Sequence, residues 1–422
     1  MSSPRAVSER AVVFLIGAVQ FVNILDFVMV MPLGPDFAAA LGIPTNQIGN
    51  IGAAYTAAAS VAGVAGSYFL DRFDRRKALA VAMLGLVVAT AAGGFATGLT
   101  SLLVARAMAG LFGGPATSLS MSIIADVIPA ERRGRAMGGV MGAFSVASVL
   151  GVPLALKVAV WADWRMPFFV VAGLGLLVVA GAIFFLPPVR GHLERERGPT
   201  VSVRELFTRT DVLLSYSLTM LLNVAGFVII PHISGYVQHN LGYPREELEF
   251  IYFAGGLVSF VTLRVAGKAV DALGSFRVGA VGAVLFIGTL YITFIHLPAG
   301  VPLVAIFACF FLSNGVRNVA ASTLTSRVPE QAIRARFMSF QSAVQHLGAA
   351  AGASLSSRLL TTLPDGQLVG LNRVVLVSMA VTLTLPVMFF LVERQVLARS
   401  RGAATPLVAP VPVASDGGAP HG

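Results

Sequence analysis

The chain contains one long segment twice, and this repeat constrains its fold more than any other feature. Residues 20–44 (QFVNILDFVMVMPLGPDFAAALGIP) recur without a gap at 220–244 (MLLNVAGFVIIPHISGYVQHNLGYP). The residues that coincide at this spacing include Asn23 and Asn223, Phe27 and Phe227, and Asp71 and Asp271. Both copies run in the same direction through a very apolar chain. The sequence therefore predicts two parallel halves, each a bundle of membrane helices, which is the architecture of secondary transporters.

The composition excludes a soluble protein. Of the 422 residues, 56% are apolar and 12% are charged, and the mean hydropathy is +0.81. A soluble protein of this size could not bury so much apolar surface, whereas a membrane protein can expose it to lipid. The net charge of +10 does not indicate a nucleic-acid partner, because the basic residues form short clusters between apolar spans. The single cysteine, Cys309, excludes an intramolecular disulfide framework.

Hydropathy predicts six spans in each half, each close to the ~20 residues that cross a bilayer. The predicted spans are 11–33, 46–68, 77–97, 99–125, 135–160, 166–187, 212–236, 247–270, 277–297, 300–326, 334–357 and 373–394. We therefore expect an all-α membrane protein with twelve transmembrane helices in two parallel-repeat six-helix bundles. The expected units are an N-terminal bundle at 1–187, a cytoplasmic linker at 188–211, a C-terminal bundle at 212–399 and a disordered tail at 400–422.

The distribution of lysine and arginine predicts the orientation of the chain. With the N-terminus in the cytoplasm, twenty-two of these residues fall in inside segments and four in outside segments. The positive-inside rule then places both termini in the cytoplasm. We expect a multi-pass protein of the cell membrane, meaning the inner or plasma membrane.

The loop after the second predicted span, residues 66–79, reads GSYFLDRFDRRKAL. It resembles the signature G-x-L-a-D-R-x-G-R-K of the major facilitator superfamily. The matching residues are Asp71, Arg72, Arg75 and Arg76. The sequence departs from the signature at Ser67 and Asp74, which stand where glycines are expected. The corresponding loop of the second half keeps Asp271 and the second glycine, Gly274.

Two further stretches carry the same resemblance. The fourth predicted span contains RAMAGLFGG, which is similar to the family's R-x-x-q-G-x-g motif through Arg106 and Gly110. GVP at 151–153 and WRMPF at 164–168 resemble the twelve-helix drug:proton antiporter and sugar-efflux branch. The resemblance covers residues 10–395. It implies the twelve-helix major facilitator fold and transport by alternating access.

The resemblance also implies a latch between the two bundles at the cytoplasmic side. Asp71 would face the positive N-terminus of the eleventh helix near Arg334, and opening of the inner gate would break this contact. The family gives Arg75 a part in the same latch. The candidate latch residues are Asp71, Arg72, Arg75, Arg76, Asp271 and Arg334. The alternative is that these charges form a topology signal in a solvated loop.

Two opposite charges lie inside the predicted first and fourth spans. Asp26 and Arg106 are each about seven residues from the outer end of their span, or ~10 Å deep at ~1.5 Å per residue. An ionised group in lipid costs ~2.5–3.5 kcal/mol and needs a partner or a wet cavity. Helices one, four, seven and ten line the cavity in the family that the chain resembles. We expect Asp26 to carry the proton and Arg106 to tune it; the alternative is a static ion pair that fixes helix packing.

Other polar residues at membrane depth are candidates for binding a polar substrate or carrying protons. In the first half they are Gln20 and Asn23, on a stripe of the helix beside Asp26. The candidates in the second half are Asn223, His232, Asn314 and Arg317. Histidine titrates near neutral pH, although a lone membrane histidine can equally serve as a hydrogen bond between helices. Arg317 lies nearer the cytoplasm and is a candidate for an anionic or polar site.

These observations predict a secondary active transporter, not an enzyme, that exports a small amphipathic or polar molecule in exchange for protons. We expect no cofactor and no metal, because the sequence has no metal-ligand spacing and no phosphate-binding loop. Transport would then be driven by a gradient, and one proton crossing 100 mV supplies ~2.3 kcal/mol. The expected partners are a small-molecule substrate, protons and the lipid bilayer, without nucleic acid, and the expected state is a monomer. One alternative is a uniporter or symporter for a sugar, organic acid or lysolipid. Another is a membrane sensor or scaffold that does not transport.

Overall fold

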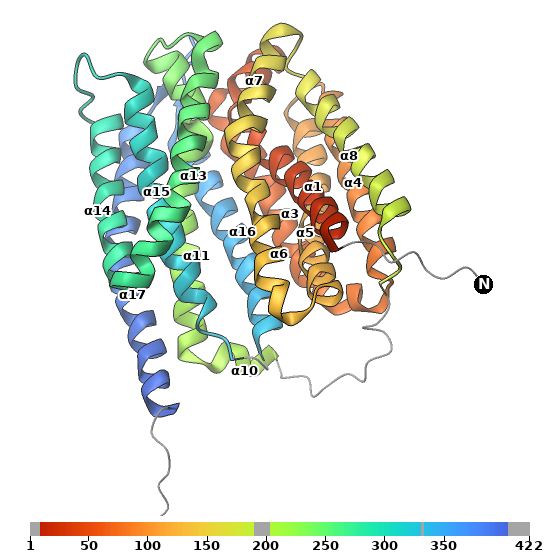
Figure 1. The fold of residues 1–422 in the computed structure, drawn as a ribbon. Coiled ribbons are helices and arrows are strands. Elements are labelled where there is room, and N and C mark those ends of the chain that lie inside the picture. Colours follow the sequence, from red (N-terminus) through yellow and green to blue (C-terminus); the bar gives the residue numbers. More distant parts are fainter. Residues whose placement is uncertain (1–8, 190–202, 331–332, 404–422) are drawn as a thin grey trace, which may run out of the picture.

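The computed structural model describes residues 9–189, 203–330 and 333–403. In this structure the chain forms two helix bundles that stand side by side (Figure 1). Most of the predicted linker, residues 190–202, lies outside the described part. The remainder of the linker contains one short helix, α10 (Val203–Thr208).

The first half supplies six spans, three of which consist of more than one helical segment. Its elements are α1 (Glu9–Met29), α2 (Gly34–Leu41), η1 (Thr45–Gln47), α3 (Ile48–Phe69), η2 (Leu70–Arg72), α4 (Arg75–Gly94), α5 (Leu99–Val127), α6 (Ala130–Val146), the π-helical η3 (Ala147–Gly151), α7 (Val152–Trp161) and α8 (Met166–Phe185). The sixth predicted span, 166–187, corresponds to α8.

The second half repeats this order. Its elements are α11 (Thr210–Phe227), η4 (Ile230–His232), α12 (Ile233–Gly235), the π-helical η5 (Tyr236–Asn240), η6 (Arg245–Glu247), α13 (Leu248–Leu273), α14 (Ser275–Phe294), α15 (Leu303–Ser326), α16 (Arg334–Leu359), β1 (Thr361–Thr362), β2 (Leu368–Val369) and α17 (Leu371–Ala403). The two strands form an antiparallel hairpin that hydropathy did not predict.

Eleven helices in the described part of the chain are long and apolar enough to cross a membrane. The twelfth span is α16, which is 26 residues long but less apolar. It packs against α3 of the other half and α11 of its own half. On these sides α16 faces protein rather than lipid, and its polar residues Gln341, Ser356 and Ser357 are buried there. The fold is therefore the predicted all-helical membrane protein with twelve spans.

The repeat is visible in the backbone as well as in the sequence. The first span of each half breaks near the same position, after Met29 in α1 and after Phe227 in α11. Both broken spans are followed by a glycine with a left-handed backbone, Gly42 with φ +63° and Gly242 with φ +65°. An L-residue with a side chain rarely adopts this conformation, which explains why Leu-Gly-x-Pro recurs in both copies.

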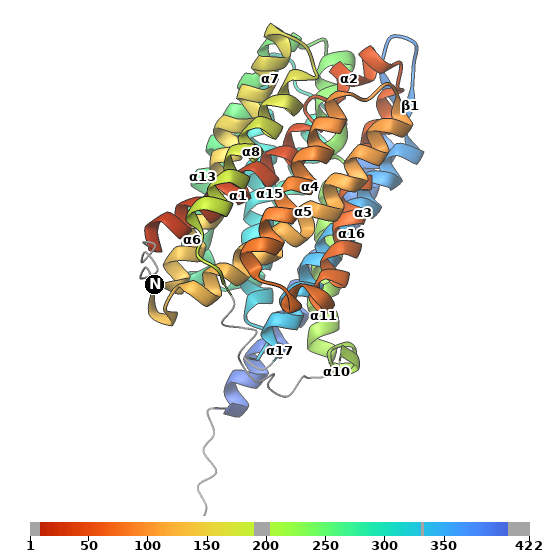
Figure 2. The same ribbon diagram turned by 90° about the vertical axis from the view of Figure 1, so that its right-hand side faces the viewer.

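The two ends of the bundles are distinguished by their loops. We call the end where α10 lies and α17 finishes the proximal end (Figure 1), and the opposite end, where the hairpin lies, the distal end (Figure 2). The halves meet along two equivalent pairs of spans, α3 with α16 and α13 with η3 and α7.

The element boundaries differ from the prediction in one place that changes a unit. The C-terminal bundle was expected to end at residue 399 and a disordered tail to begin at 400. In the structure α17 continues to Ala403. Polar and basic residues in its last turns lower the hydropathy without breaking the helix, since arginine is a good helix former. Residues 404–422 lie outside the described part.

Candidate functional site

A buried ion pair joins α1 and α5 in the first half. Arg106 Nη1 lies 3.0 Å from both carboxylate oxygens of Asp26, and Nη2 donates to the Asp26 carbonyl oxygen at 3.2 Å. Thr90 of α4 donates its hydroxyl to Asp26 Oδ1 at 2.7 Å. Asp26 is 0% and Arg106 1% exposed. The two residues therefore face each other as predicted, and the hydroxyl of Thr90, from a third helix, is a further hydrogen-bond donor to the carboxylate.

Tyr55 of α3 extends the pair into a network. The Arg106 guanidinium lies 4.8 Å from the centre of the Tyr55 ring, a cation–π contact. The Tyr55 hydroxyl donates to Asn23 Oδ1 at 2.9 Å, and Asn23 Nδ2 donates to Thr117 Oγ1 at 2.7 Å. Gln20 reaches the same threonine at 3.5 Å, the limit of a hydrogen bond. Four helices of one bundle therefore share one polar network around a single acid.

Glycine in α5 makes room for this network. A Cβ at Gly113 would lie 2.4 Å from the Tyr55 hydroxyl and 2.7 Å from Asn23 Oδ1. A Cβ at Gly110 would lie 2.1 Å from the Tyr55 carbonyl oxygen. Real side chains do not tolerate such distances, so both positions require glycine. Close approach of α3 to α5 is what brings the tyrosine onto the arginine.

An aromatic contact links this network to the other half. The Phe27 ring stacks on Tyr55 with centroids 5.0 Å apart and contacts Phe227 with centroids 6.1 Å apart. Phe27 and Phe227 are equivalent positions of the repeat, so the two copies touch at their symmetry-related residues. The network thus lies beside the boundary between the bundles.

The second half does not reproduce the ion pair. The residue equivalent to Asp26 is Gly226, and Asn223 donates to Thr219 O of its own helix at 2.8 Å. The Thr219 hydroxyl is hydrogen-bonded instead by Gln341 of α16. The only titratable pair of this kind in the described residues therefore belongs to the first half.

Arg317 of α15 is a buried cation with neutral partners. It is 0% exposed and donates to Asn314 Oδ1 at 2.8 Å and to Thr382 Oγ1 at 3.3 Å. Its guanidinium lies 3.4 Å from the ring centre of Phe286. Two of the predicted candidates, Arg317 and Asn314, thus lie together. Their contacts run toward α14 and α17 of the same bundle, and a role in binding stays a prediction.

The distal end is closed by contacts between the halves. Asn46 donates its backbone N–H to Thr362 Oγ1 at 2.9 Å and its side-chain amide to the carbonyl oxygens of Ser357 and Leu360 at 3.1 and 2.9 Å. Ser60, further along α3, donates to Ala343 O at 2.9 Å. These hydrogen bonds join α3 to α16 both at the distal end, through Asn46, and midway along the helices, through Ser60.

The second pair of spans carries an ionic clamp at the same end. Arg245 binds Asp36 of α2 with two of its guanidinium nitrogens: Nε donates to Oδ1 at 2.7 Å and Nη2 donates to Oδ2 at 2.5 Å. Lys157 of α7 pairs with Glu249 of α13 at 3.1 Å. We call the Asn46 contacts and the Arg245–Asp36 pair the distal clamps. Both lie at the start of equivalent spans, one in each half.

The predicted latch residues at the proximal end make contacts within their own halves. Arg75 Nε lies 3.2 Å from Asp126 of α5, and Arg76 donates to Leu186 O at 3.1 Å. Asp271 pairs with Arg327 at 3.5 Å. Arg72 and Arg334 are exposed, and the side chain of Asp71 lies outside the described residues. A latch between Asp71 and the start of α16 therefore stays a prediction.

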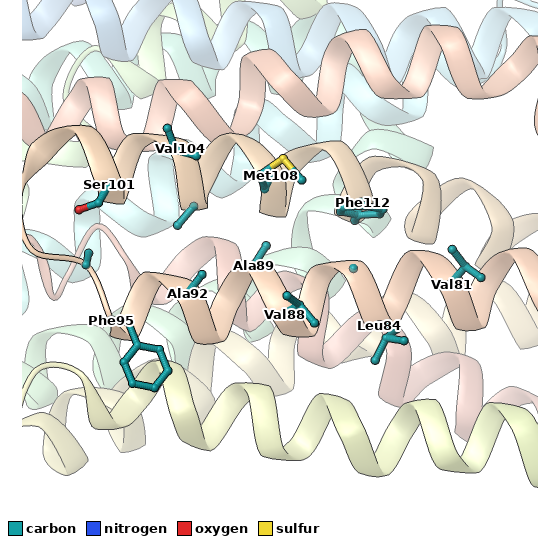
Figure 3. A pocket seen from close by; sticks show the side chains of 13 residues that line it. Val81, Leu84, Val88, Ala89, Ala92, Phe95, Ser101, Val104, Met108 and Phe112 are labelled. Carbon is teal, nitrogen blue, oxygen red and sulfur yellow. The ribbon is translucent and has the colours of Figure 1, made fainter.

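The first half also carries an apolar groove on the opposite face of α5. It has a volume of about 740 Å³, lies between α4 and α5, and is lined by residues that include Val81, Leu84, Val88, Met108 and Phe112 (Figure 3). Ser101 is the one hydroxyl in its lining. The groove offers apolar contact of the kind that lipid chains make, so the polar network is the better candidate for a functional site.

The sequence of the chain is similar to those of known transporters. The sequence profile of the Major Facilitator Superfamily matches residues 16–353. The chain belongs to this superfamily. The transporter is 26% identical over 335 residues to a chloramphenicol resistance protein of Streptomyces lividans, covering 79% of this chain and 84% of that protein. It is 25% identical over 357 residues to the purine ribonucleoside efflux pump NepI of Salmonella enteritidis, covering 83% and 86%.

Solved structures of the superfamily share the fold of this transporter. A bacterial homologue of the human lysosomal transporter Spinster, inward-facing and occupied, matches with a TM-score of 0.74 at 15% identity, covering 94% of this chain and 99% of that one. A D-xylose–proton symporter matches with a TM-score of 0.72 at 16% identity, covering 90% and 96%. Its membership of the superfamily makes the chain a multi-pass membrane transporter and not an enzyme.

Several residues of the site were not singled out from the sequence. Nothing in the sequence around Tyr55 and Thr90 marks them as site residues. The packing of α3 places Tyr55 against Arg106, and the packing of α4 places Thr90 against Asp26. The ionic clamp had a weak signal, because Arg245 is one of the few basic residues expected outside. Nothing in the sequence indicated that Asn46 would bond across the two halves.

Proposed function

We propose that this superfamily member is a proton-coupled exporter of a small amphipathic or polar molecule. The observation that carries the proposal is the buried Asp26–Arg106 pair, which is the one place in the described first half where an acid is held at membrane depth. Buried ion pairs are costly to desolvate and contribute little net stability, so their presence in a membrane points to a role in transport. The resemblance of the chain to a purine ribonucleoside efflux pump supports the direction of export.

The chemistry of the pair suits exchange of a proton for a substrate. Protonation of Asp26 removes its charge and weakens its ion pair with Arg106, so the hydrogen bond from Thr90 to Asp26 and the contact of Arg106 with the Tyr55 ring must rearrange. A ligand that draws Arg106 or Asn23 toward itself acts on the same bonds. Proton and substrate then compete for one network, and each state favours a different arrangement of α1 and α5.

Alternating access follows from the two halves. With the distal clamps closed, the site is shielded from the distal side, and we assign that side to the outside because most basic residues lie at the other end. Both termini then lie in the cytoplasm, and the described conformation is closed toward the outside. We propose that the protein works as a monomer in the cell membrane.

The test is transport by purified protein in proteoliposomes with an imposed pH gradient. Chloramphenicol and adenosine are the first probes, because one relative is a chloramphenicol resistance protein and another is a purine ribonucleoside efflux pump. Asp26→Asn keeps the size of the side chain but cannot carry the proton. We expect it to lose uphill transport while keeping exchange of labelled for unlabelled substrate.

The matched control is Asp163→Asn, which makes the same chemical change in an exposed loop acid. We expect this variant to transport as the wild type does. Full gradient-driven transport by Asp26→Asn would refute the proposed role of the pair. Accumulation by the wild type in the direction of the proton flow would instead indicate a symporter.

A further inference from the structure

A histidine lies at the boundary between the halves at the distal end. His232 of η4 is 1% exposed, and its Nε2 is 2.8 Å from Ser356 Oγ of α16. A Cβ at Gly49 of α3 would lie 3.1 Å from the same nitrogen. Gly49 belongs to the first half and His232 to the second. The edge of the imidazole ring is therefore covered by the opposite bundle only while the distal end is closed.

One ring nitrogen of His232 has no partner in the described structure. The Ser356 hydroxyl is also 2.8 Å from Ala353 O, to which it donates. Because the serine donates its one hydroxyl proton to Ala353 O, the histidine donates to the serine from Nε2. The imidazole is then neutral, and Nδ1 carries a lone pair and no proton. Nδ1 is buried and has no hydrogen-bond partner among the described residues. A buried polar atom without a partner costs about 1–3 kcal/mol, so its persistence needs an explanation.

The packed elements offer no counter-ion to a charged imidazole. Among the side chains that the structure describes, the titratable groups on α3, α11, α12 and α16, the helices against η4 and Ser356, are Tyr55, Asp211, Tyr216, Arg334, Arg336, His346 and Arg358. The single acid among them, Asp211, lies in the first turn of α11 at the proximal end and pairs with Arg399 at 2.7 Å. Asp36 at the distal end is held by Arg245. An imidazolium at this position would be buried without a carboxylate.

We propose that His232 is a second proton site that couples the distal gate to the external proton. When the halves part at Gly49, the ring meets outside water and can take up a proton on the free nitrogen. A charged imidazole cannot be returned to a dry interface without a counter-charge, so the gate closes only after the proton has left. By linkage, acid outside favours the open distal gate as much as opening favours protonation.

This inference rests on the proposed proton-coupled transport and adds a role in gating that Asp26 does not fill. Asp26 lies inside one bundle, whereas His232 lies between the two. The two sites would act in sequence, because the histidine is reached from outside first. Protonation of the histidine opens the distal side, and the acid in the network is then within reach of the same water.

The experiment measures the distance across the distal gate in lipid nanodiscs. Spin labels are placed at Ala40→Cys in α2 and Leu363→Cys in the hairpin, both exposed, in a Cys309→Ser background. Distance distributions are compared at about pH 8 and about pH 5.5, which bracket the ordinary range of histidine. A one-proton linkage permits up to about tenfold change per pH unit, and we expect the open fraction to rise at least about threefold.

The variant His232→Gln cannot take up the proton and should abolish this rise. His239→Gln is the matched control, since His239 is also at the distal end but contacts Gly366 of its own half. We expect it to respond to pH as the wild type does. Asp26→Asn should also keep the response, which separates failure of this inference from failure of the proposed function.

Ser356→Ala provides a second test that keeps the histidine. It removes the hydrogen bond to Nε2, so the open fraction should rise at both pH values while the pH response remains. An unchanged pH response in His232→Gln, or a wild type whose gate distance does not depend on pH, would overturn the proposal. Loss of the response in His239→Gln would move the proton site to that residue and overturn it equally.

Discussion

The rings of Phe27 and Phe227 touch across the boundary between the two bundles, with centroids 6.1 Å apart. These residues occupy the same position in the two copies of the repeat. The contact places the local symmetry axis between them, beside the polar network that holds Asp26. The symmetric framework thus surrounds an asymmetric site, because the second half has Gly226 where the first has the acid.

Removal of one ring from this contact should loosen the closed distal gate. An aromatic pair contributes about 0.5–1.5 kcal/mol beyond its buried area, so Phe227→Ala should raise the open fraction roughly two- to tenfold. The spin-label pair at residues 40 and 363 measures this fraction. Phe250→Ala, a 56% exposed phenylalanine of α13, should leave it unchanged. Equal effects of both variants would contradict a specific role for the axis contact.

A side chain at Gly49 should hold the distal gate open. A Cβ there would lie 2.3 Å from the backbone oxygen of Ala353 in the other half, and backbone cannot move aside cheaply. In Gly49→Val, a thiol reagent added from outside should modify a cysteine placed at the buried Ala350, and transport should be lost. Gly63→Val is the control on the same helix, because its Cβ meets nothing within 4 Å. Protection of the cysteine in Gly49→Val would count against this prediction.

The stability of the protein should depend on Asp26 and Arg106 as a pair. Removing one partner of a buried ion pair typically costs about 3–5 kcal/mol, because the other charge is left buried. Asp26→Asn and Arg106→Gln should each lower the thermal unfolding midpoint in detergent, and the double variant should be more stable than additivity predicts.

The control for this cycle is the exposed pair of Glu9 and Arg132, which lie 2.9 Å apart with side chains 37% and 60% exposed. A surface pair contributes about 0–1 kcal/mol, so Glu9→Gln and Arg132→Gln should have little effect and should add. Additive losses at Asp26 and Arg106 would show that the two do not depend on each other.

The two distal clamps should act independently. Asn46→Ala removes hydrogen bonds between α3 and α16, and Arg245→Ala removes the ionic bond to Asp36. Because the clamps lie on different pairs of spans, their effects on the free energy of gate closure should add. The open fraction measured by spin labels should rise in each single variant and multiply in the double variant. If the double variant is no more open than either single variant, the two clamps do not act independently and the prediction is wrong.

Much of the fold could be predicted because the bilayer imposes a simple length rule. Apolar runs near ~20 residues identify spans, and the coincidence of Asn23 with Asn223 and of the Leu-Gly-x-Pro segments shows that the halves are copies. The rule was weakest at α16, which is less apolar than the other spans, and the symmetry of the repeat supported the span that hydropathy predicted at 334–357. The hairpin after α16 left no hydropathy signal.

For the site residues, the sequence predicted only how deep in the membrane each one lies along its helix. Counting residues placed Asp26 and Arg106 at the same level, and the structure brings them together. The same counting placed Arg317 at membrane depth without indicating that it would turn toward Phe286 and Thr382. Depth depends on position in the chain, whereas direction depends on how each helix is rotated against its neighbours.

The sequence by itself determined that this protein is a duplicated bundle of membrane helices with a buried acid and base in its first half. Only the tertiary structure decided that Tyr55 and Thr90 complete that pair, that Asn46 and Arg245 clamp the distal end, and that His232 lies under Gly49. The physical reason is that solvation by lipid or water acts on each residue separately and can be read along the chain. Contacts between helices depend instead on packing among residues far apart in sequence.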